Sequence, residues 1–552
     1  MVSHGTSGTP SLPAGNVHPA IRTDAAARAV YSEAAGVARI VPLGVAQPGS
    51  VAEVSELVRW CGEAGTPLIA RGAGSSMSGG AIGEGLIVDL SRLRRMGDVD
   101  VERKMLTTGA GVARADANAA ALRAGLRFPP DPSSGPFCTI GGMCATNAAG
   151  AHTLRFGATR PWIDGLECVF DDGSVAWVRR GRPLATNVPA IGRFMQVAGE
   201  IRERARRIAP LAVRKDSSGY ALGEWASGGE LVDLLVGSEG TLALFTAAEL
   251  RLTAEAAATA SILAAFDELE PCAAAATTAG ECGAVACELL DRTFLDVARS
   301  GGVELPGTAR TEALLLIAIE GGSAGAARET ARSIGERMTA LGAAHVQVAL
   351  DSDAERGIWA LRHSASPVLS RLHPALASMQ FIEDSAVPPA RLPEYVRGVR
   401  EILDRNGTRG VIFGHAGDAH VHVNPLVDTR RADWRERVAR ILGEVADLTV
   451  RLGGTLAGEH GDGRLRTPLL ARVHGDAAMQ LYSEVKAAFD PRGILNPGVK
   501  IPLRGQRPLD AIKYDPALEP LHPAAARALA HVAAARDYLA DRLELLDRFE
   551  EG

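Results

Sequence analysis

The segment RGAGSSMSGG at residues 71–80 directly follows a short apolar stretch, residues 68–70. Glycine permits backbone conformations in which successive amides point into a loop, and the serines add hydroxyl donors. Such a loop after a strand is typical of phosphate binding, although a plain surface turn also fits it. A nicotinamide-type GxGxxG motif is excluded, because Met77 stands at the third glycine position and no helix opens there.

Two further segments are equally rich in small residues. Residues 131–152 read DPSSGPFCTIGGMCATNAAGAH, and residues 237–242 read GSEGTL. Three such segments within one stretch of the chain predict a long ligand lying along bare backbone. Residues 129–161 are expected to be too irregular for a helix.

The surrounding pattern predicts ordinary secondary structure. Ser50 and Glu53 form a capping box before an amphipathic helix, and residues 166–170 and 174–178 form a hairpin. Near residue 250 the sequence pattern changes to alanine-rich helices alternating with strands. We therefore expect a domain boundary there. Residues 432–452 and the segment from Pro523 onward are amphipathic helices, the second docking on the body or on another subunit.

Composition excludes several classes of protein. A net charge of −6 argues against a nucleic-acid-binding face. Seven cysteines without CxxC spacing argue against a disulfide framework, a zinc ribbon or an iron–sulfur cluster in this chain. The first twenty residues lack the features of a signal peptide, and no apolar run is long enough for a membrane helix. We therefore expect a cytoplasmic protein, at most peripheral at the inner face of the membrane.

Histidines cluster in FGHAGDAHVHVN, residues 413–424. Two strands joined by a tight turn are predicted here, and His420, His422 and Asn424 share one face of the second strand by its two-residue period. The turn brings His415 beside them. Residues 458–463, GEHGDG, offer a carboxylate and a further imidazole in a glycine-rich setting. Histidines with a carboxylate indicate a divalent-metal site, whereas each histidine taken alone is more often structural.

These segments carry a family resemblance. Residues 71–80, 131–152, VRKDSSGYAL (213–222), LVGSEGTLAL (235–244) and FDPRGILNPGVKI (489–501) resemble the PCMH-type FAD domain of the vanillyl-alcohol-oxidase superfamily. The resemblance spans residues 38–502 and points to the branch of D-lactate, glycolate and D-2-hydroxyglutarate dehydrogenases. It implies an α+β fold, in which a two-subdomain FAD-binding domain precedes a cap domain with an antiparallel sheet flanked by helices.

The domains are then expected in four segments. They are a flexible leader (1–36), the FAD-binding domain (37–253), the cap carrying the substrate and metal site (254–502) and a helical tail (503–552). By resemblance, the loop 71–77 holds the pyrophosphate, with residues Arg71, Gly72, Ala73, Gly74, Ser75, Ser76 and Met77. The rest of the FAD is lined by Ser133, Ser134, Thr139, Gly142, Thr146, Asn147, Ala149, Gly150, Glu239, Gly240 and Leu242. The absence of His and Cys from residues 71–80 predicts non-covalent FAD.

The branch also has GHxGDxxxHxN followed by GEHG, and both occur here. The resemblance makes His415, His422 and Glu459 metal ligands and His460 the catalytic base. His420 departs from the pattern, since the branch commonly has Asn there. It either tunes the site or adds a ligand. Zinc is the first choice for the metal, with manganese or iron left open.

On the substrate side, residues 359–362 resemble the segment whose arginine pairs with the substrate carboxylate, which implies this role for Arg362. Asn424 is expected to hydrogen-bond the substrate. Ile382 stands where the 2-hydroxyglutarate enzymes carry a lysine, which favours lactate-like or glycolate-like acids over a five-carbon diacid and leaves a bulky apolar acid as an alternative.

The implied reaction is oxidation of a D-2-hydroxy acid to the 2-keto acid. A neutral His460 takes the hydroxyl proton beside the metal, and the α-hydride moves to flavin N5. The electron acceptor is expected to be a quinone, a cytochrome, an electron-transfer flavoprotein or a separate iron–sulfur subunit. A homodimer is one option for the assembly.

Three other readings stay open. The chain fits the flavin subunit of a glycolate or lactate oxidase complex whose iron–sulfur subunit is a separate polypeptide. It also fits a non-redox flavoprotein resembling alkylglycerone-phosphate synthase. A metal hydrolase or binding protein that uses only the histidine cluster is the third reading.

Overall fold

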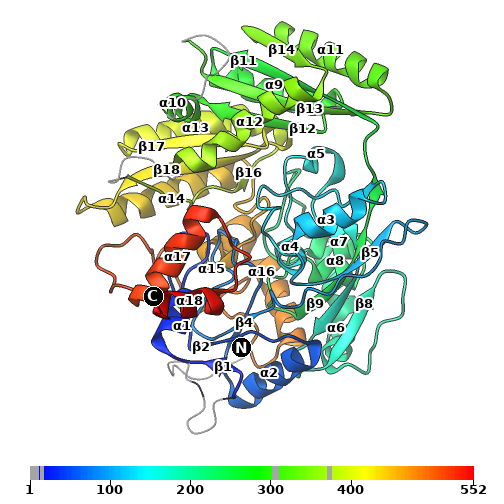
Figure 1. Ribbon diagram of the computed structural model, residues 1–552, viewed down its shortest axis with the longest axis vertical. Coiled ribbons are helices and arrows are strands. Elements are labelled where there is room, and N and C mark those ends of the chain that lie inside the picture. Colours follow the sequence, from blue (N-terminus) through cyan, green and yellow to red (C-terminus); the bar gives the residue numbers. More distant parts are fainter. Residues whose placement is uncertain (1–11, 13–17, 301–309, 370–375, 552) are drawn as a thin grey trace.

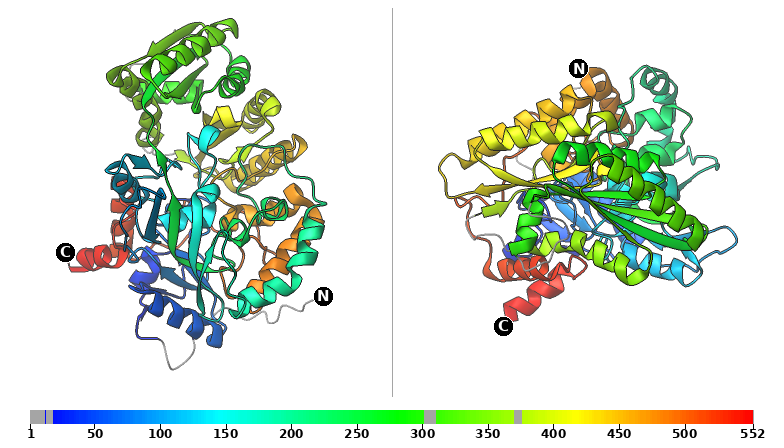
Figure 2. Two further views of the ribbon diagram at one scale, coloured as in Figure 1. Left: turned by 90° about the vertical axis from the view of Figure 1, so that its right-hand side faces the viewer. Right: turned by 90° about the horizontal axis from the view of Figure 1, so that it is seen from above.

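The computed structural model describes residue 12 and residues 18–300, 310–369 and 376–551. Three sheets organise the chain. Two four-stranded sheets and their helices form the lower body in Figure 1, and an eight-stranded sheet with its helices lies above them. In the left view of Figure 2 the chain beyond residue 470 (orange and red) returns from the upper layer to the lower body.

The first sheet has the order β1-β2-β4-β3, from Ile21–Arg22, Gly44–Ala46, Leu86–Asp89 and Leu68–Arg71. β2, β4 and β3 are parallel, and both faces are covered. On one face Leu68 and Leu86 pack against α2 (Val51–Ala64), which begins after Ser50 as its capping pattern predicts. On the other face Ile69 and Ile87 pack against α1 (Ala25–Val30), α17 (Pro523–Ala535) and α18 (Arg542–Glu551).

The second sheet is antiparallel, in the order β5-β9-β7-β8, from Met105–Gly109, Leu244–Arg251, Ile163–Val169 and Val175–Arg179. β7 and β8 form the predicted hairpin. A large apolar cluster joins this sheet to α4 (Ile140–Thr146), α6 (Pro189–Ala205) and α16 (Leu470–Phe489). A short two-stranded ladder, β6 (Leu126–Arg127) with β10 (Thr253–Ala254), lies beside them. α3 (Arg114–Leu122), α7 (Leu222–Ala226) and α8 (Leu231–Leu235) are further helices of this body.

The expectation that residues 129–161 contain no helix is wrong. α4 and α5 (Thr153–Phe156) lie within that segment. The Thr139 hydroxyl accepts a hydrogen bond from the Gly142 amide and caps α4, and Asn147 ends it in a left-handed conformation (φ 53°). Buried Ile140 and Met143 anchor the short helix in the core, so tertiary packing outweighs the low helix propensity of its glycines.

The eight-stranded sheet runs β14-β11-β13-β12-β17-β18-β15, and β16 also pairs with β18. The strands are His345–Ala349, Ala258–Phe266, Ala313–Gly321, Ala286–Asp291, Arg409–Gly414, His420–Asp428, Leu376–Ser378 and Ser385–Ala386. Alternate residues face opposite layers of helix. One layer contains α9 (Leu269–Glu281), α11 (Ala324–Ala340), α13 (Leu392–Arg405) and α14 (Trp434–Arg451), and the other contains α10 (Arg292–Ser300) and α12 (Ser352–Leu369).

The prediction of a flexible leader over residues 1–36 does not hold for residues 21–31, which are folded. Residues 1–11 and 13–17 lie outside the described residues, but β1 pairs with β2, and Ala27, Val30 and Tyr31 are fully buried beneath the first sheet. These apolar residues at helical spacing form part of the core rather than a flexible leader. No helix in the described part of the chain is long and apolar enough to cross a membrane.

Candidate active site

A cavity of about 860 Å³ lies among the three glycine-rich segments. Most of the predicted cofactor residues line it: Arg71, Gly72, Ala73, Gly74, Ser75, Ser76, Met77, Ser133, Ser134, Thr139, Gly142, Thr146, Ala149, Glu239 and Gly240. Three predicted residues do not. Asn147 caps α4, Gly150 accepts a hydrogen bond from Lys215, and Leu242 is buried in the apolar core.

The first loop meets this cavity mainly with backbone and small side chains, and the guanidinium of its one charged residue, Arg71, is bonded to backbone carbonyls. The Arg71 guanidinium is buried, donates to the carbonyl oxygens of Tyr31 and Glu33 and lies over the Tyr31 ring at 5.0 Å. Gly74 adopts φ 72°, and a Cβ there would lie 2.4 Å from that guanidinium. A cavity of this volume, bordered by bare backbone, fits a large cofactor.

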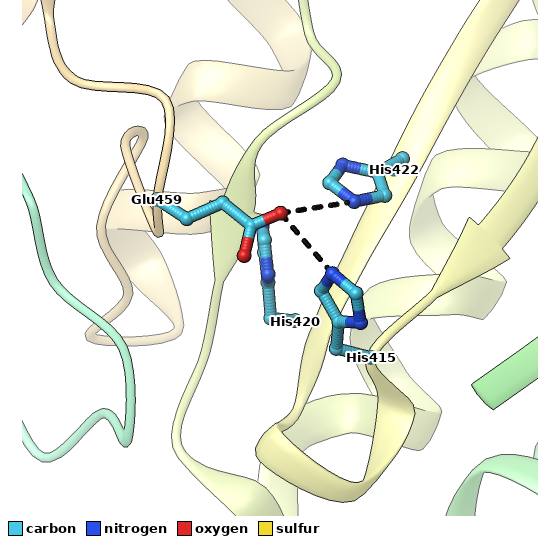
Figure 3. A group of neighbouring side chains, drawn as sticks. All are labelled: His415, His420, His422 and Glu459. Carbon is cyan, nitrogen blue, oxygen red and sulfur yellow. Dashed lines mark hydrogen bonds and ion pairs between the residues drawn. The ribbon is translucent and has the colours of Figure 1, made fainter. Parts of the chain in front are cut away.

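The histidine hairpin forms as predicted. β17 and β18 pair with Phe413 opposite His422, and the turn between them includes Ala419 in a left-handed conformation (φ 55°). His415, His420 and His422 converge, with ring centroids 4.8–5.5 Å apart. Figure 3 shows these imidazoles around the Glu459 carboxylate.

Glu459 joins the hairpin to a loop beyond α14. Its Oε1 atom lies 3.1 Å from His415 Nε2, 3.4 Å from His422 Nε2 and 3.6 Å from His460 Nε2. Its Oε2 atom accepts a hydrogen bond from buried Lys215 Nζ at 2.9 Å. One carboxylate oxygen therefore faces three imidazoles, while the other is paired with the Lys215 ammonium group.

The hydrogen bonds of His422 favour a cation between these groups. Its Nδ1 lies 2.7 Å from the backbone carbonyl oxygen of Glu383, which can only accept, so Nδ1 carries the proton. In the neutral ring Nε2 then presents a lone pair to the Glu459 oxygen, which is also an acceptor. Burial lowers the pKa of His422, which opposes a second proton on the ring. A divalent cation satisfies both acceptors, as in His/carboxylate metal sites.

The candidate ligand atoms fall into two overlapping groups, each within 4.8 Å. One group is His415, His420, His422 and Glu459, and the other is Asp384, His422, Glu459 and His460. The Nε2 atom of His420 lies 2.9 Å from Asp384 Oδ1, and its Nδ1 has no hydrogen-bond partner among the described residues. All three predicted ligands are thus brought together, with His420 beside them.

Several charged residues of the site were missed from the sequence. Buried Glu288 on β12 lies 2.5 Å from His415 Nδ1 and accepts from Arg362 Nε at 2.6 Å. Asp384 accepts from the backbone amides of Glu459 and His460 and so fixes their loop. Glu383, which forms an ion pair with Arg466, lies 3.2 Å from His460 Nδ1.

These carboxylates control the ionisation of the imidazoles. Burial alone lowers the pKa of His415, but Glu288 raises it to about 9. Burial likewise opposes charge on His460, but Asp384 and Glu383 raise its pKa to about 9. His420 has its pKa lowered to about 3 by burial. The neutral His460 that the resemblance implies is therefore not favoured in the protein without a cation, because acidic groups surround the ring.

The two predicted substrate residues lie near this cluster. Arg362, on α12, stacks over the Phe413 ring at 5.0 Å while its Nε is bonded to Glu288. Asn424, on β18, is buried, and its Oδ1 has no hydrogen-bond partner among the described residues. Ile382 is buried in the apolar core of the eight-stranded sheet. Glu459 and His460 also line the glycine-bordered cavity, so the cluster and the cavity form one site.

Comparison with known proteins agrees with this architecture. Residues 42–179 match the FAD binding domain family, and residues 255–499 match the family of FAD linked oxidases, C-terminal domain. The glycolate oxidase subunit GlcD of Bacillus subtilis (strain 168) is 31% identical over 486 residues, which cover 86% of this chain and 92% of the relative. The D-lactate dehydrogenase of Archaeoglobus fulgidus is 30% identical, over 82% of this chain and 90% of the relative.

Solved structures show the same fold at lower identity. A 4-ethylphenol oxidase from Gulosibacter chungangensis superposes with a TM-score of 0.63 and 17% identity, over 88% of this chain and 95% of that one. An alkyldihydroxyacetonephosphate synthase superposes with a TM-score of 0.60 and 14% identity, over 88% and 85%. The chain belongs to the FAD-linked oxidoreductases of the glycolate, D-lactate and D-2-hydroxyglutarate dehydrogenase type.

Proposed function

We propose that this protein oxidises a small D-2-hydroxy acid, lactate-like or glycolate-like, to the 2-keto acid with non-covalently bound FAD as the electron acceptor. The observation that carries the proposal is the shared position of Glu459 and His460. Both line the cavity bordered by the glycine-rich loops, and both approach the hairpin histidines. The names of the similar relatives support the same substrate class.

Each group has a distinct part. His415, His422 and Glu459 would hold a divalent cation, zinc being the first choice, which supplies a Lewis acid for the substrate oxygens. The glycine-rich loops would hold FAD, which supplies the two-electron oxidant. A bound cation would oppose a second proton on the adjacent His460 ring, so neutral His460 accepts the proton of the substrate hydroxyl at Nε2, because Glu383 engages its Nδ1.

Substrate orientation falls to Arg362 and Asn424. Glu288 accepts a hydrogen bond from Nε of Arg362 and so fixes the plane of the guanidinium. Its Nη groups can then donate to a substrate carboxylate. The buried Asn424 amide supplies a further polar contact. By the family resemblance, Ile382 stands where the 2-hydroxyglutarate enzymes carry a lysine, and the missing charge favours a substrate without a second carboxylate.

Anaerobic mixing with single hydroxy acids tests this function. D-lactate or glycolate should bleach the visible flavin absorbance, whereas L-lactate should not. His460→Ala should retain FAD and lose about 10²–10⁴ in the rate of bleaching. A protein whose flavin is reduced by none of these acids, or a His460→Ala variant with the full rate, contradicts the proposal.

A second candidate differs only in assembly. Two of the relatives, from Bacillus subtilis and Escherichia coli, are named as a subunit of glycolate oxidase. In that case this chain is the flavin subunit, and a separate polypeptide passes the electrons on. Affinity purification of the chain from its native cells, with analysis of co-purifying iron, distinguishes the two assemblies.

A further inference from the structure

The C-terminal helices form part of the cofactor cavity. α17 and α18 lie beyond the segment matched by the FAD linked oxidase family, which ends at residue 499. Five residues from this region nevertheless line the same cavity as the glycine-rich loops: Ala530, Ala533, Ala534, Arg536 and Tyr538. Figure 1 shows α17 and α18 (red) against the first sheet and α1.

α17 has two faces with different roles. Ala525, Ala528 and Val532, at helical spacing, are buried against the first sheet and α1. Ala530, Ala533 and Ala534 share another side and line the cavity. The first face fixes the helix in the core, so the second face is a fixed wall of the cavity.

Arg536 stands at the end of this wall in an unusual conformation. It caps α17 with φ 54°, a left-handed geometry that non-glycine residues adopt infrequently. Its guanidinium lies 5.2 Å from the centroid of the Phe137 ring, which also packs against Tyr538 at 5.1 Å. Phe137 belongs to the second glycine-rich segment and lines the cavity as well. The Phe137 ring, itself packed against Tyr538, thus holds the guanidinium at the cavity.

The cavity contains few cations to meet an anionic cofactor. Its lining arginines are Arg71 and Arg536. Arg71 is buried and its guanidinium donates hydrogen bonds to backbone carbonyls, whereas Arg536 is exposed. No salt bridge joins Arg536 to a carboxylate within the described ranges. Its charge is therefore free to pair with a diphosphate.

The position of α17 and α18 indicates which part of FAD would lie beside them, namely the adenosine diphosphate part. The residues around the start of α18 make polar contacts with the first sheet and its loops, where Gln47 Nε2 donates to Asp541 Oδ1 and Arg94 donates to the carbonyl of Leu539. Ile69, on the strand that leads into loop 72–77, packs in the same cluster as α17. His460, next to which the reacting flavin ring must lie, belongs to the loop beyond α14.

We propose that Arg536 binds the diphosphate of FAD and that α17 forms the wall of the site for its adenosine diphosphate moiety. This inference rests on FAD binding and is independent of which hydroxy acid the enzyme oxidises. ADP alone should therefore bind the apoprotein at the same place and compete with FAD.

Titration of the full-length apoprotein tests the proposal. Arg536→Ala should weaken both FAD and ADP by about tenfold, measured by flavin fluorescence and by competition, because a charge-assisted contact is lost. Riboflavin, which has no phosphate, should bind the variant as it binds the wild type. Arg536→Lys should restore part of the ADP affinity. Arg548→Ala removes an equal charge from an exposed position on α18 that does not line the cavity and should change neither affinity.

A second pair of variants tests the wall. Ala533→Phe projects a ring into the cavity and should lower FAD and ADP affinity, whereas Ala526→Phe, exposed on the same helix and outside the cavity lining, should not. The proposal is overturned if Arg536→Ala binds ADP like the wild type. It is equally overturned if riboflavin affinity falls by the same factor as ADP affinity, or if the two phenylalanine variants behave alike.

Discussion

The two halves of the active site use opposite chemistry. The loop 71–77 and the segment 133–149, which contains α4, meet the cavity mainly with backbone and small side chains, and the guanidinium of their one arginine, Arg71, is bonded to backbone carbonyls. The cluster around Glu459 instead consists of buried ionisable side chains, each held by another charged group. The first half depends on having small side chains or none, whereas the second depends on particular ionisable side chains.

This difference determines how each half tolerates change. A cavity wall made of backbone loses its ligand when an added side chain fills the cavity. A charged cluster is destabilised when one charge loses its partner, because the remaining charge is left buried and unpaired. Glu459 shows the second case, since it faces His415, His422 and Lys215 together. Substitutions should therefore separate FAD loading from metal binding.

The largest effect is expected at Gly74. Gly74→Val should yield folded protein without FAD, because valine disfavours φ 72° and its side chain would displace the Arg71 guanidinium that shapes the loop. Flavin absorbance per protein and circular dichroism measure the two properties. Gly181→Val is a suitable control, since it has a similar φ (63°) and nothing within 4 Å of its Cβ. Equal flavin content in the two variants would refute this role for Gly74.

Next in size is the loss of metal. His422→Ala should remove the bound divalent ion yet keep FAD, whereas His420→Asn should retain the ion because the Nε2 of His420 faces Asp384. Elemental analysis of purified protein gives the metal content, and absorbance gives the flavin content. Loss of metal from both variants would instead make His420 a ligand.

A smaller effect is expected at Glu288. Glu288→Gln keeps the shape but removes the charge that joins Arg362 to His415, and metal affinity should fall by about 10–100-fold, as for other groups that orient metal ligands. The Michaelis constant for the hydroxy acid should rise as well, because Arg362 loses its anchor. Competition with a chelator of known affinity measures the first change. Wild-type metal affinity in this variant would show that His415 needs no such partner.

The smallest effect concerns stability and pH. Burial raises the pKa of Asp291 from 3.8 to about 6, so its neutral form stabilises the fold below pH 4 and this stabilisation is lost as the pH rises through about 6. Asp291→Asn remains neutral and can still accept from the Phe294 amide. Its melting temperature relative to wild type should therefore increase between pH 4 and pH 8 by about 1–3 °C. Exposed Asp476→Asn gives the effect of losing one surface charge, and an identical pH trend in both variants would contradict the assignment.

Local sequence predicted the features that depend on neighbouring residues. The glycine-rich loops, the hairpin that carries His415 and His422, and the helix that precedes Glu459 could all be predicted from composition and spacing. α4 was missed because its signals, Thr139 at the start and Asn147 at the end, lie within a segment dominated by glycine and alanine. Reading these two residues as caps would have found it.

The second layer of the site could not be predicted in the same way. Glu288 meets a histidine 127 positions away, and Lys215 meets Glu459 across 244 positions, so no local spacing connects them. A weaker signal exists, because Glu288 is the one acid inside the apolar stretch 284–290 and an ionised group in a buried strand needs a partner. Which partner it has depends on the pairing of β12 with β17.

The packing of α17 and α18 also sets an order for biosynthesis. Ile69 and Ile87 leave the ribosome early, but their apolar neighbours Ala525, Val532 and Leu546 are made several hundred residues later. Until these helices are made, only α1 covers this face of the first sheet, and the whole upper layer is translated in the meantime. Apolar strand surface exposed for that long invites aggregation, so a nascent chain halted before residue 523 should depend on chaperones more than the finished protein does.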